Sequence, residues 1–141
     1  MNKLLLALLA VFSINIVAAQ SDIINNSGEY VAYNTDGSKN AIYNLKKGVA
    51  DGAVVFFNEN GSKKEEGAFI DGNRDGKWLK WDEKGTLISE ANYINGKKDG
   101  AWKIWDENGI LRYEMYYKEG KKIGTWKQYD AEGNLTSEKK Q

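Results

Sequence analysis

Glycine recurs in this chain with a period of 24 residues, and the spacing never slips along the chain. The period is kept by three series: Gly28, Gly52, Gly76, Gly100 and Gly124; Gly37, Gly61, Gly85, Gly109 and Gly133; and Gly48, Gly72, Gly96 and Gly120. Only Gly67 lies outside these series. A fixed period of this length is typical of a repeat protein, in which each unit buries its apolar face against its neighbours.

Aromatic residues share this period. They fill most positions two and five residues after each glycine of the first series: Tyr30, Tyr33, Phe57, Trp78, Trp81, Trp102, Trp105, Trp126 and Tyr129. An Asx residue follows directly, and three residues later comes a glycine of the second series, as in Asp82-Glu83-Lys84-Gly85. This pattern is typical of a type I turn closed by a left-handed residue, which joins antiparallel strands. Each unit therefore predicts one β-hairpin.

A second type of connection joins successive hairpins. The segment from Asn95 to Gly100 contains two glycines four residues apart and has the composition of a turn. The glycines expected in structural turns of either type are Gly61, Gly76, Gly85, Gly96, Gly100, Gly109, Gly120, Gly124 and Gly133. The spaced glycines leave no apolar period of 3.6 residues, which argues against helices.

The expected fold is therefore all-β, an elongated antiparallel ribbon of 24-residue hairpins. Two strands per unit advance such a ribbon by roughly 10 Å. The sequence does not decide whether one or both faces of the ribbon carry aromatic side chains. Because Trp78 and Trp81 are three residues apart, either both faces carry aromatics or a bulge rotates one side chain back.

The chain divides into a leader and five units. Residues 1–19 have the pattern of a signal peptide, with Lys3 before an apolar run and small residues ending at Ala19. Residues 20–27 are expected to form a short linker, and the units are 28–51, 52–75, 76–99, 100–123 and 124–141. We expect export, to the periplasm or out of the cell, after cleavage near Ala19. An uncleaved membrane anchor or a buried helix is the alternative, but the apolar run is short for a spanning helix, so we expect no transmembrane segment in the mature form.

The composition excludes several classes of function. The sequence contains no histidine and no cysteine, which removes Ser-His-Asp and Cys-His nucleophile systems and ordinary zinc sites. Lys plus Arg equals Asp plus Glu at 20 each, whereas nucleic-acid binders usually carry a basic excess. We therefore expect a protein that is not an enzyme, needs no cofactor or metal and binds no nucleic acid.

Two sets of carboxylates could have either a functional or a purely structural role. One recurs once per unit: Glu66, Glu90, Glu114 and Glu138. Its members are expected about 10 Å apart, too far to share a proton, and cross-strand pairing with lysines is the preferred interpretation. The aspartates of the turns are oxygen-rich, as calcium loops are, but capping of the turn backbone explains them better.

Two sets of side chains could form a binding surface. The aromatic set is Trp78, Trp81, Trp102, Trp105, Trp126, Tyr93 and Tyr117, which could instead be the core of the ribbon. The basic set is Arg74, Lys97, Lys98, Lys121 and Lys122, expected as a row along one edge. Asp75 and Asp99 fall within this row and reduce its net charge.

The segment from Tyr93 to Trp102, and its echo from Tyr117 to Trp126, resemble the MORN repeat in its bacterial variant. Both have an aromatic residue, two glycines four apart and a tryptophan, followed by an Asx-to-Gly turn such as Asp106 to Gly109. The resemblance implies a hairpin ribbon that binds proteins or, in some members, phospholipids. Some bacterial relatives are labelled antitoxins of toxin–antitoxin systems. The leading hypothesis is an exported scaffold that binds another protein, with a surface glycan or anionic lipid as the alternative ligand and an antitoxin-like role as a further one.

Overall fold

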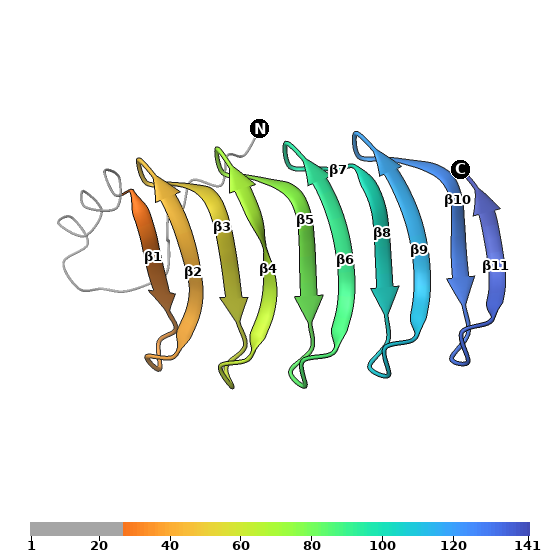
Figure 1. Ribbon diagram of the computed structural model, residues 1–141, viewed down its shortest axis with the longest axis horizontal. Helices are drawn as coiled ribbons and strands as arrows, with labels where there is room; N and C mark the ends of the chain where they lie inside the picture. The colour runs from red at the N-terminus through yellow and green to blue at the C-terminus, as the bar shows by residue number, and fades with distance from the viewer. Residues whose placement is uncertain (1–26) are drawn as a thin grey trace.

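The computed structural model describes residues 27–141, so the predicted signal peptide and all of the predicted linker but Ser27 lie outside the described residues. The described residues form one antiparallel sheet of 11 strands. Figure 1 shows the strands following one another along an elongated single layer, with turns at both long edges. The prediction of an all-β antiparallel hairpin ribbon is confirmed.

Each repeat contributes two strands. At the boundary between the third and fourth repeats, one strand is interrupted and counted as two, β7 and β8. The strands are β1 (Gly28–Tyr33), β2 (Lys39–Lys46), β3 (Val49–Phe57), β4 (Lys63–Ile70), β5 (Asn73–Trp81), β6 (Leu87–Ile94), β7 (Lys97–Lys98), β8 (Gly100–Trp105), β9 (Leu111–Lys118), β10 (Lys121–Tyr129) and β11 (Leu135–Lys140). Neighbours in the sheet follow chain order, and β7 and β8 both pair with β6, in the place that β5 or β10 fills alone elsewhere. The described part of the chain contains no helix long and apolar enough to cross a membrane.

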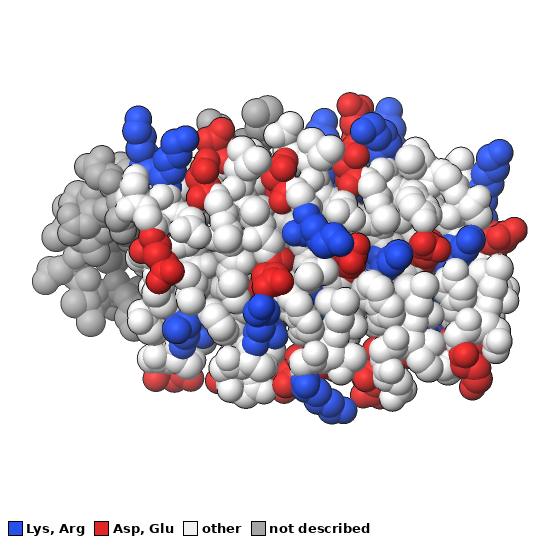
Figure 2. All heavy atoms as spheres, in the orientation of Figure 1, with Lys and Arg blue, Asp and Glu red and all other residues white. Residues whose placement is uncertain are grey.

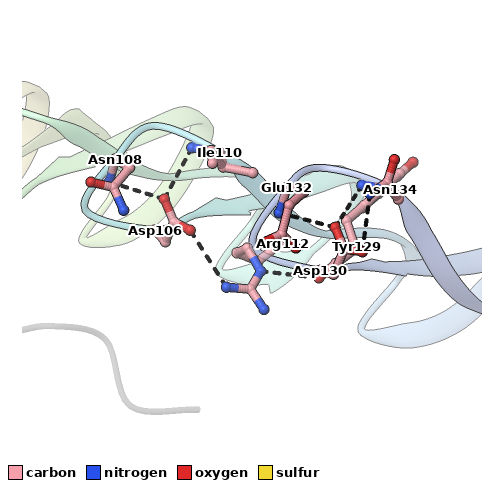
Figure 3. A network of polar contacts seen from close by, with 8 residues as sticks. All are labelled: Asp106, Asn108, Ile110, Arg112, Tyr129, Asp130, Glu132 and Asn134. Atoms are coloured by element: carbon pink, nitrogen blue, oxygen red, sulfur yellow. Dashed lines mark hydrogen bonds and ion pairs between the residues drawn. The ribbon is translucent and has the colours of Figure 1, made fainter.

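At one long edge of the ribbon, the Asx residue closes its own turn (Figure 3). The Asp106 carboxylate accepts hydrogen bonds from the backbone N–H groups of Asn108 and Ile110, at 2.9 and 3.1 Å. Gly109 then takes a φ of +76° and donates its N–H to the Asp106 carbonyl oxygen at 3.0 Å. The turn thus satisfies its polar groups locally and requires glycine at its fourth position.

Replacing Gly109 by valine is expected to lower the free energy of unfolding by about 1–3 kcal/mol, because β-branched residues rarely adopt positive φ. No heavy atom lies within 4 Å of a Cβ built at Gly109, so the cost comes from the backbone conformation alone. Urea unfolding measures it, with Glu107→Val in the same turn as the control. Equal loss in both variants contradicts the left-handed assignment.

At the opposite edge, only two residues form each turn. Asn95 and Gly96 have φ values of 50° and 78°, as in a type I′ turn. Gly76, Gly100 and Gly124, which the sequence pattern assigns to turns, lie in strands instead. The physical reason is a bulge at each junction between units. For example, Glu66 pairs with Leu79 and Ala68 with Asp75, so three residues of β5 oppose the single residue Gly67.

An aspartate of each of the first three units fixes the type I′ turn of the next unit. The Asp75 carboxylate accepts the backbone N–H of Asn95 at 3.0 Å, while the Gly96 N–H donates to the Arg74 carbonyl oxygen at 2.8 Å. Asp99 holds Glu119 in the same way at 3.1 Å. Asp75 and Asp99, which fall within the basic row of the sequence, therefore join successive repeats.

Hydrogen bonds to the aspartates at both long edges of the ribbon make the stability of the fold depend on pH. The pKa of Asp82 is lowered mainly by the Thr86 N–H, that of Asp130 by the Asn134 N–H, and that of Asp99 by the Glu119 N–H. A lowered folded-state pKa means that the stabilisation is complete above the unfolded value of about 3.9 and is lost as the pH falls through the folded value.

We therefore expect the melting temperature to be constant from neutral pH to about pH 5 and to fall below about pH 4. Thermal unfolding followed by circular dichroism measures this profile. A variant with Asp82→Asn and Asp130→Asn should melt lower at neutral pH and lose less on acidification. If the melting temperature of this variant falls on acidification as much as that of the parent, other carboxylates cause the loss of stability.

Candidate binding surface

One face of the sheet carries a continuous series of rings, here named the aromatic ladder: Tyr43, Phe56, Phe69, Trp78, Tyr93, Trp102, Tyr117 and Trp126. From Trp78 to Trp126, successive ring centroids lie 6.4, 5.4, 5.4 and 5.2 Å apart. Burial varies along it, since Trp78 is 2% and Tyr117 8% exposed whereas Trp102 and Trp126 are only half-buried. The ladder is therefore core at Trp78, and its last two indole rings are partly accessible.

The indole rings are held by the preceding repeat. The Nε1–H groups of Trp102 and Trp126 donate to the backbone carbonyl oxygens of Asn92 and Tyr116, at 3.1 and 3.2 Å. Trp78 has no such bond, because its buried Nε1 has no hydrogen-bond partner within the described structure. Its ring instead lies against Gly67, where a Cβ would be 2.3 Å from the Trp78 Cδ2 atom. Each tryptophan thus bridges two units.

Three cations lie over the ladder, one per repeat. The Arg74 guanidinium carbon is 3.8 Å from the Trp78 ring centroid, and the Nζ atoms of Lys98 and Lys122 are 4.1 and 4.3 Å from those of Trp102 and Trp126. Such stacking is attractive, and more so where water is excluded. Arg74 also forms two hydrogen bonds to the Glu65 carboxylate, at 2.8 and 3.2 Å. Lys98 and Lys122 form no ion pair with any described residue.

The basic residues do not form one row along an edge, as the sequence pattern suggested. Lys97 and Lys98 are consecutive in β7, and Lys121 and Lys122 are consecutive in β10, so in each pair the side chains point to opposite faces. Lys98 and Lys122 lie over rings of the ladder, although Lys122 stays exposed, whereas Lys97 and Lys121 are exposed on the other face. Strand alternation explains the separation.

The predicted aromatic set is divided between the two faces as well. Trp78 and Trp81 lie three residues apart in β5, and none of the rings that contact Trp78 contacts Trp81. Trp81 instead contacts Lys63, whose Nζ is 5.1 Å from its centroid and pairs with the Glu66 carboxylate. Trp105 occupies the equivalent position in β8. Both faces therefore carry aromatics, which decides between the two alternatives left open by the spacing.

The face opposite the ladder is polar along its middle. Cross-strand pairing places Lys103 between Glu90 and Glu114, and Lys127 between Glu114 and Glu138. Figure 2 shows this alternation of positive and negative side chains on the face turned toward the viewer. The predicted row of glutamates is thus interleaved with lysines, which is the arrangement of a solvated sheet face. Residues 27–141 contain no group of acidic side chains placed to hold a metal ion.

An open groove of about 480 Å³ lies on the ladder face at its C-terminal end. Ile104, Tyr113, Met115 and Trp126 supply its apolar lining, and Lys122 and Lys139 add positive charge. Tyr113 is 40% exposed and contacts no ring of the ladder. Of the residues singled out in the sequence, only Trp126 and Lys122 line the groove.

The other groove residues were missed because their signal depends on hairpin register. Ile104 and Tyr113 form one cross-strand pair, as do Gln128 and Ser137. Their positions vary in residue type between units, so the repeat pattern does not mark them. Aligning the two strands of each hairpin on its Asx turn would have identified these residues as cross-strand pairs.

Arg112 joins two units beside the Asx turns and is next to Tyr113 in β9. Figure 3 shows its guanidinium between the Asp106 turn and the end of β10. Its Nε donates to the Tyr129 carbonyl oxygen at 3.0 Å, and its Nη1 to the Asp106 carboxylate at 3.4 Å. The strands that line the groove are thus tied together from outside it.

One of three comparisons with known proteins assigns part of the chain to a family. Residues 74–95, 98–119 and 122–140 match the family model of the MORN repeat variant. A comparison with the curated proteins finds no match. Among solved structures, a point mutant of S. aureus TarM in complex with fondaparinux, alpha-GlcNAc-glycerol and UDP has 15% identity and a TM-score of 0.43, over 81% of this chain and 24% of that chain. A second structure of TarM has 15% identity and a TM-score of 0.41, over 79% of this chain and 25% of that chain.

The family match agrees with the structure. The three matched segments are consecutive and lie within the 24-residue period that the glycines define. The same hairpin, with the same two turn types, continues through the units before residue 74. Over residues 74–140, the chain consists of three consecutive MORN-variant repeats.

Proposed function

We propose that this chain is an exported, non-enzymatic scaffold that binds another protein through the C-terminal half of the aromatic ladder. The observation that carries the proposal is the open groove beside Trp126, where apolar side chains remain accessible on the sheet. Exposed apolar surface rimmed by polar groups is typical of protein interaction sites. Its aromatic and methionine side chains are types enriched in protein interfaces.

The other parts of the proposal come from the sequence. The lack of histidine and cysteine removes the common nucleophile and acid–base systems, which supports a binding role. The leader pattern that ends at Ala19 supports export. A surface-glycan or anionic-lipid module is the second candidate, favoured by the exposed ammonium groups of Lys97 and Lys121.

A pull-down from the native envelope fraction tests the proposal, with the full chain as bait at low and high salt. The groove variant carries Tyr113→Ala and Ile104→Ala. Its matched control carries Tyr33→Ala and Ile70→Ala, which truncate side chains that are 60% and 50% exposed outside the groove. Both variants should keep the melting temperature of the parent to within a few degrees.

We expect a protein that the parent and the control retain at high salt and that the groove variant loses. Aromatic and apolar contacts persist at high ionic strength, whereas exposed charge attraction is screened. Equal recovery by the two variants removes the groove from the function. Recovery of lipid or glycan alone, released by salt, supports the second candidate instead.

A further inference from the structure

Charge is distributed unequally between the two faces of the sheet. The whole chain is balanced, with 20 basic and 20 acidic residues. From Lys98 onward, however, the strand positions on the ladder face hold three lysines and no carboxylate: Lys98, Lys122 and Lys139. The glutamates of the neighbouring strands, such as Glu90 and Glu114, alternate with lysines on the opposite face. The ladder face therefore attracts an anionic partner.

The cations over the ladder have a regular spacing. Arg74, Lys98 and Lys122 occupy the same position in successive repeats, and each lies over a tryptophan. Two strands separate neighbouring cations, which corresponds to about 9.4–9.8 Å along the ribbon. A polyproline II segment repeats its side-chain direction every three residues, over about 9.3 Å. An acidic residue at every third position of such a segment would therefore meet successive cations.

The lining of this face suits an extended peptide better than a flat membrane. The Nζ atoms of Lys98 and Lys122 lie on the indole rings, so these lysine stems run along the ladder rather than out from it. Tyr93, Trp102 and Trp126 are only half-buried, so beside each cation part of a ring stays accessible, and proline rings can pack against it. Aromatic-lined grooves are a known mode of polyproline II recognition, and the preformed helix loses little entropy on binding.

On the basis of the protein-binding function proposed above, we propose that the ladder face binds an extended acidic segment of its partner, in polyproline II conformation, with Asp or Glu at every third position. The acidic groups lie beside Lys98 and Lys122, and an apolar side chain of the segment enters the groove beside Trp126 and Met115. The charge of the lysines selects the acidic segment, and the repeat length selects its spacing.

Three synthetic peptides with blocked ends test this inference on the full chain, by tryptophan fluorescence titration. The first repeats Glu-Pro-Pro four times. The second has the same composition with its glutamates contiguous, and the third replaces each glutamate by glutamine. We expect the first to bind with a dissociation constant below about 1 mM and the other two to bind at least about tenfold more weakly.

A matched pair of variants locates the site. Lys98→Gln with Lys122→Gln should weaken binding of the first peptide about tenfold or more, whereas Lys97→Gln with Lys121→Gln, which removes the same charge from the opposite face, should change it by less than about threefold. Circular dichroism checks that both variants remain folded.

Several outcomes overturn the inference. Equal binding of the contiguous peptide removes the spacing, and equal binding of the glutamine peptide removes the role of charge. If no peptide binds while the parent still retains a protein in the pull-down, the acidic segment is wrong and the proposed function stands. Binding to vesicles of anionic lipid in place of the peptides assigns the positive face to a membrane.

Discussion

Replacing Trp78 by alanine is expected to lower the free energy of unfolding by about 3–5 kcal/mol, the usual cost of truncating a fully buried large aromatic residue. Trp78 is 2% exposed, and its ring contacts those of Phe56, Phe69 and Tyr93. Its removal also leaves the Arg74 guanidinium without the ring that lies 3.8 Å from it. A single-layer sheet has no second layer that could close the resulting cavity.

Trp81→Ala is the matched control, because it removes the same side chain from the same strand. Trp81 is only half-buried on the opposite face, where Lys63 is its cationic neighbour. Its truncation should cost less than that of Trp78 by about 1–2 kcal/mol. Urea unfolding with a common slope measures both. If the two variants are equally destabilised, the ladder face is not the core of the ribbon.

Replacing Gly67 by alanine is expected to destabilise the protein by about 1–3 kcal/mol or more, as overpacking of a tight site does. The added Cβ would lie 2.3 Å from Cδ2 and 2.4 Å from Cε2 of Trp78. Gly67 does not have a positive φ, so the penalty comes from the ring above it and not from the backbone. The rigid indole has to move, and its contacts to Phe69 and Tyr93 move with it.

A double-mutant cycle separates this effect from any loss of strand propensity. In the Trp78→Ala background, the space above Gly67 is free, so Gly67→Ala should cost little or even stabilise the strand. We expect a coupling free energy of at least about 1 kcal/mol between the two sites. Additive losses would show that the close approach of Trp78 is not the reason for glycine at this position.

The hairpin ribbon could be predicted because its signals are local and repeat. An Asx residue and a glycine three positions later determine a turn through hydrogen bonds within five residues, as at Asp82 and Thr86. The first glycine series was misplaced for the opposite reason. Gly76 has a φ of +73° because its strand bulges against β4, and the pairing partner lies outside the local sequence.

The candidate surface was predicted in part. The sequence identified the tryptophans and lysines, but not which of them share a face, since a bulge can change the alternation within a strand. Lys97 and Lys98 are adjacent residues of the same type and differ only in the face to which the side chain points. Gly67 was seen only as an exception to the period.

The amino-acid sequence alone specifies the repeat, the hairpin and the ribbon, because each unit encodes its own turns and buries its aromatics on similar neighbours. Features that depend on contacts between units emerge only in the folded protein. The tertiary structure places Gly67 beneath Trp78, separates Lys98 and Lys122 from the lysines next to them, and leaves the groove beside Trp126 open. These features follow from strand register and from the reach of each indole across to the preceding repeat, which no single unit specifies.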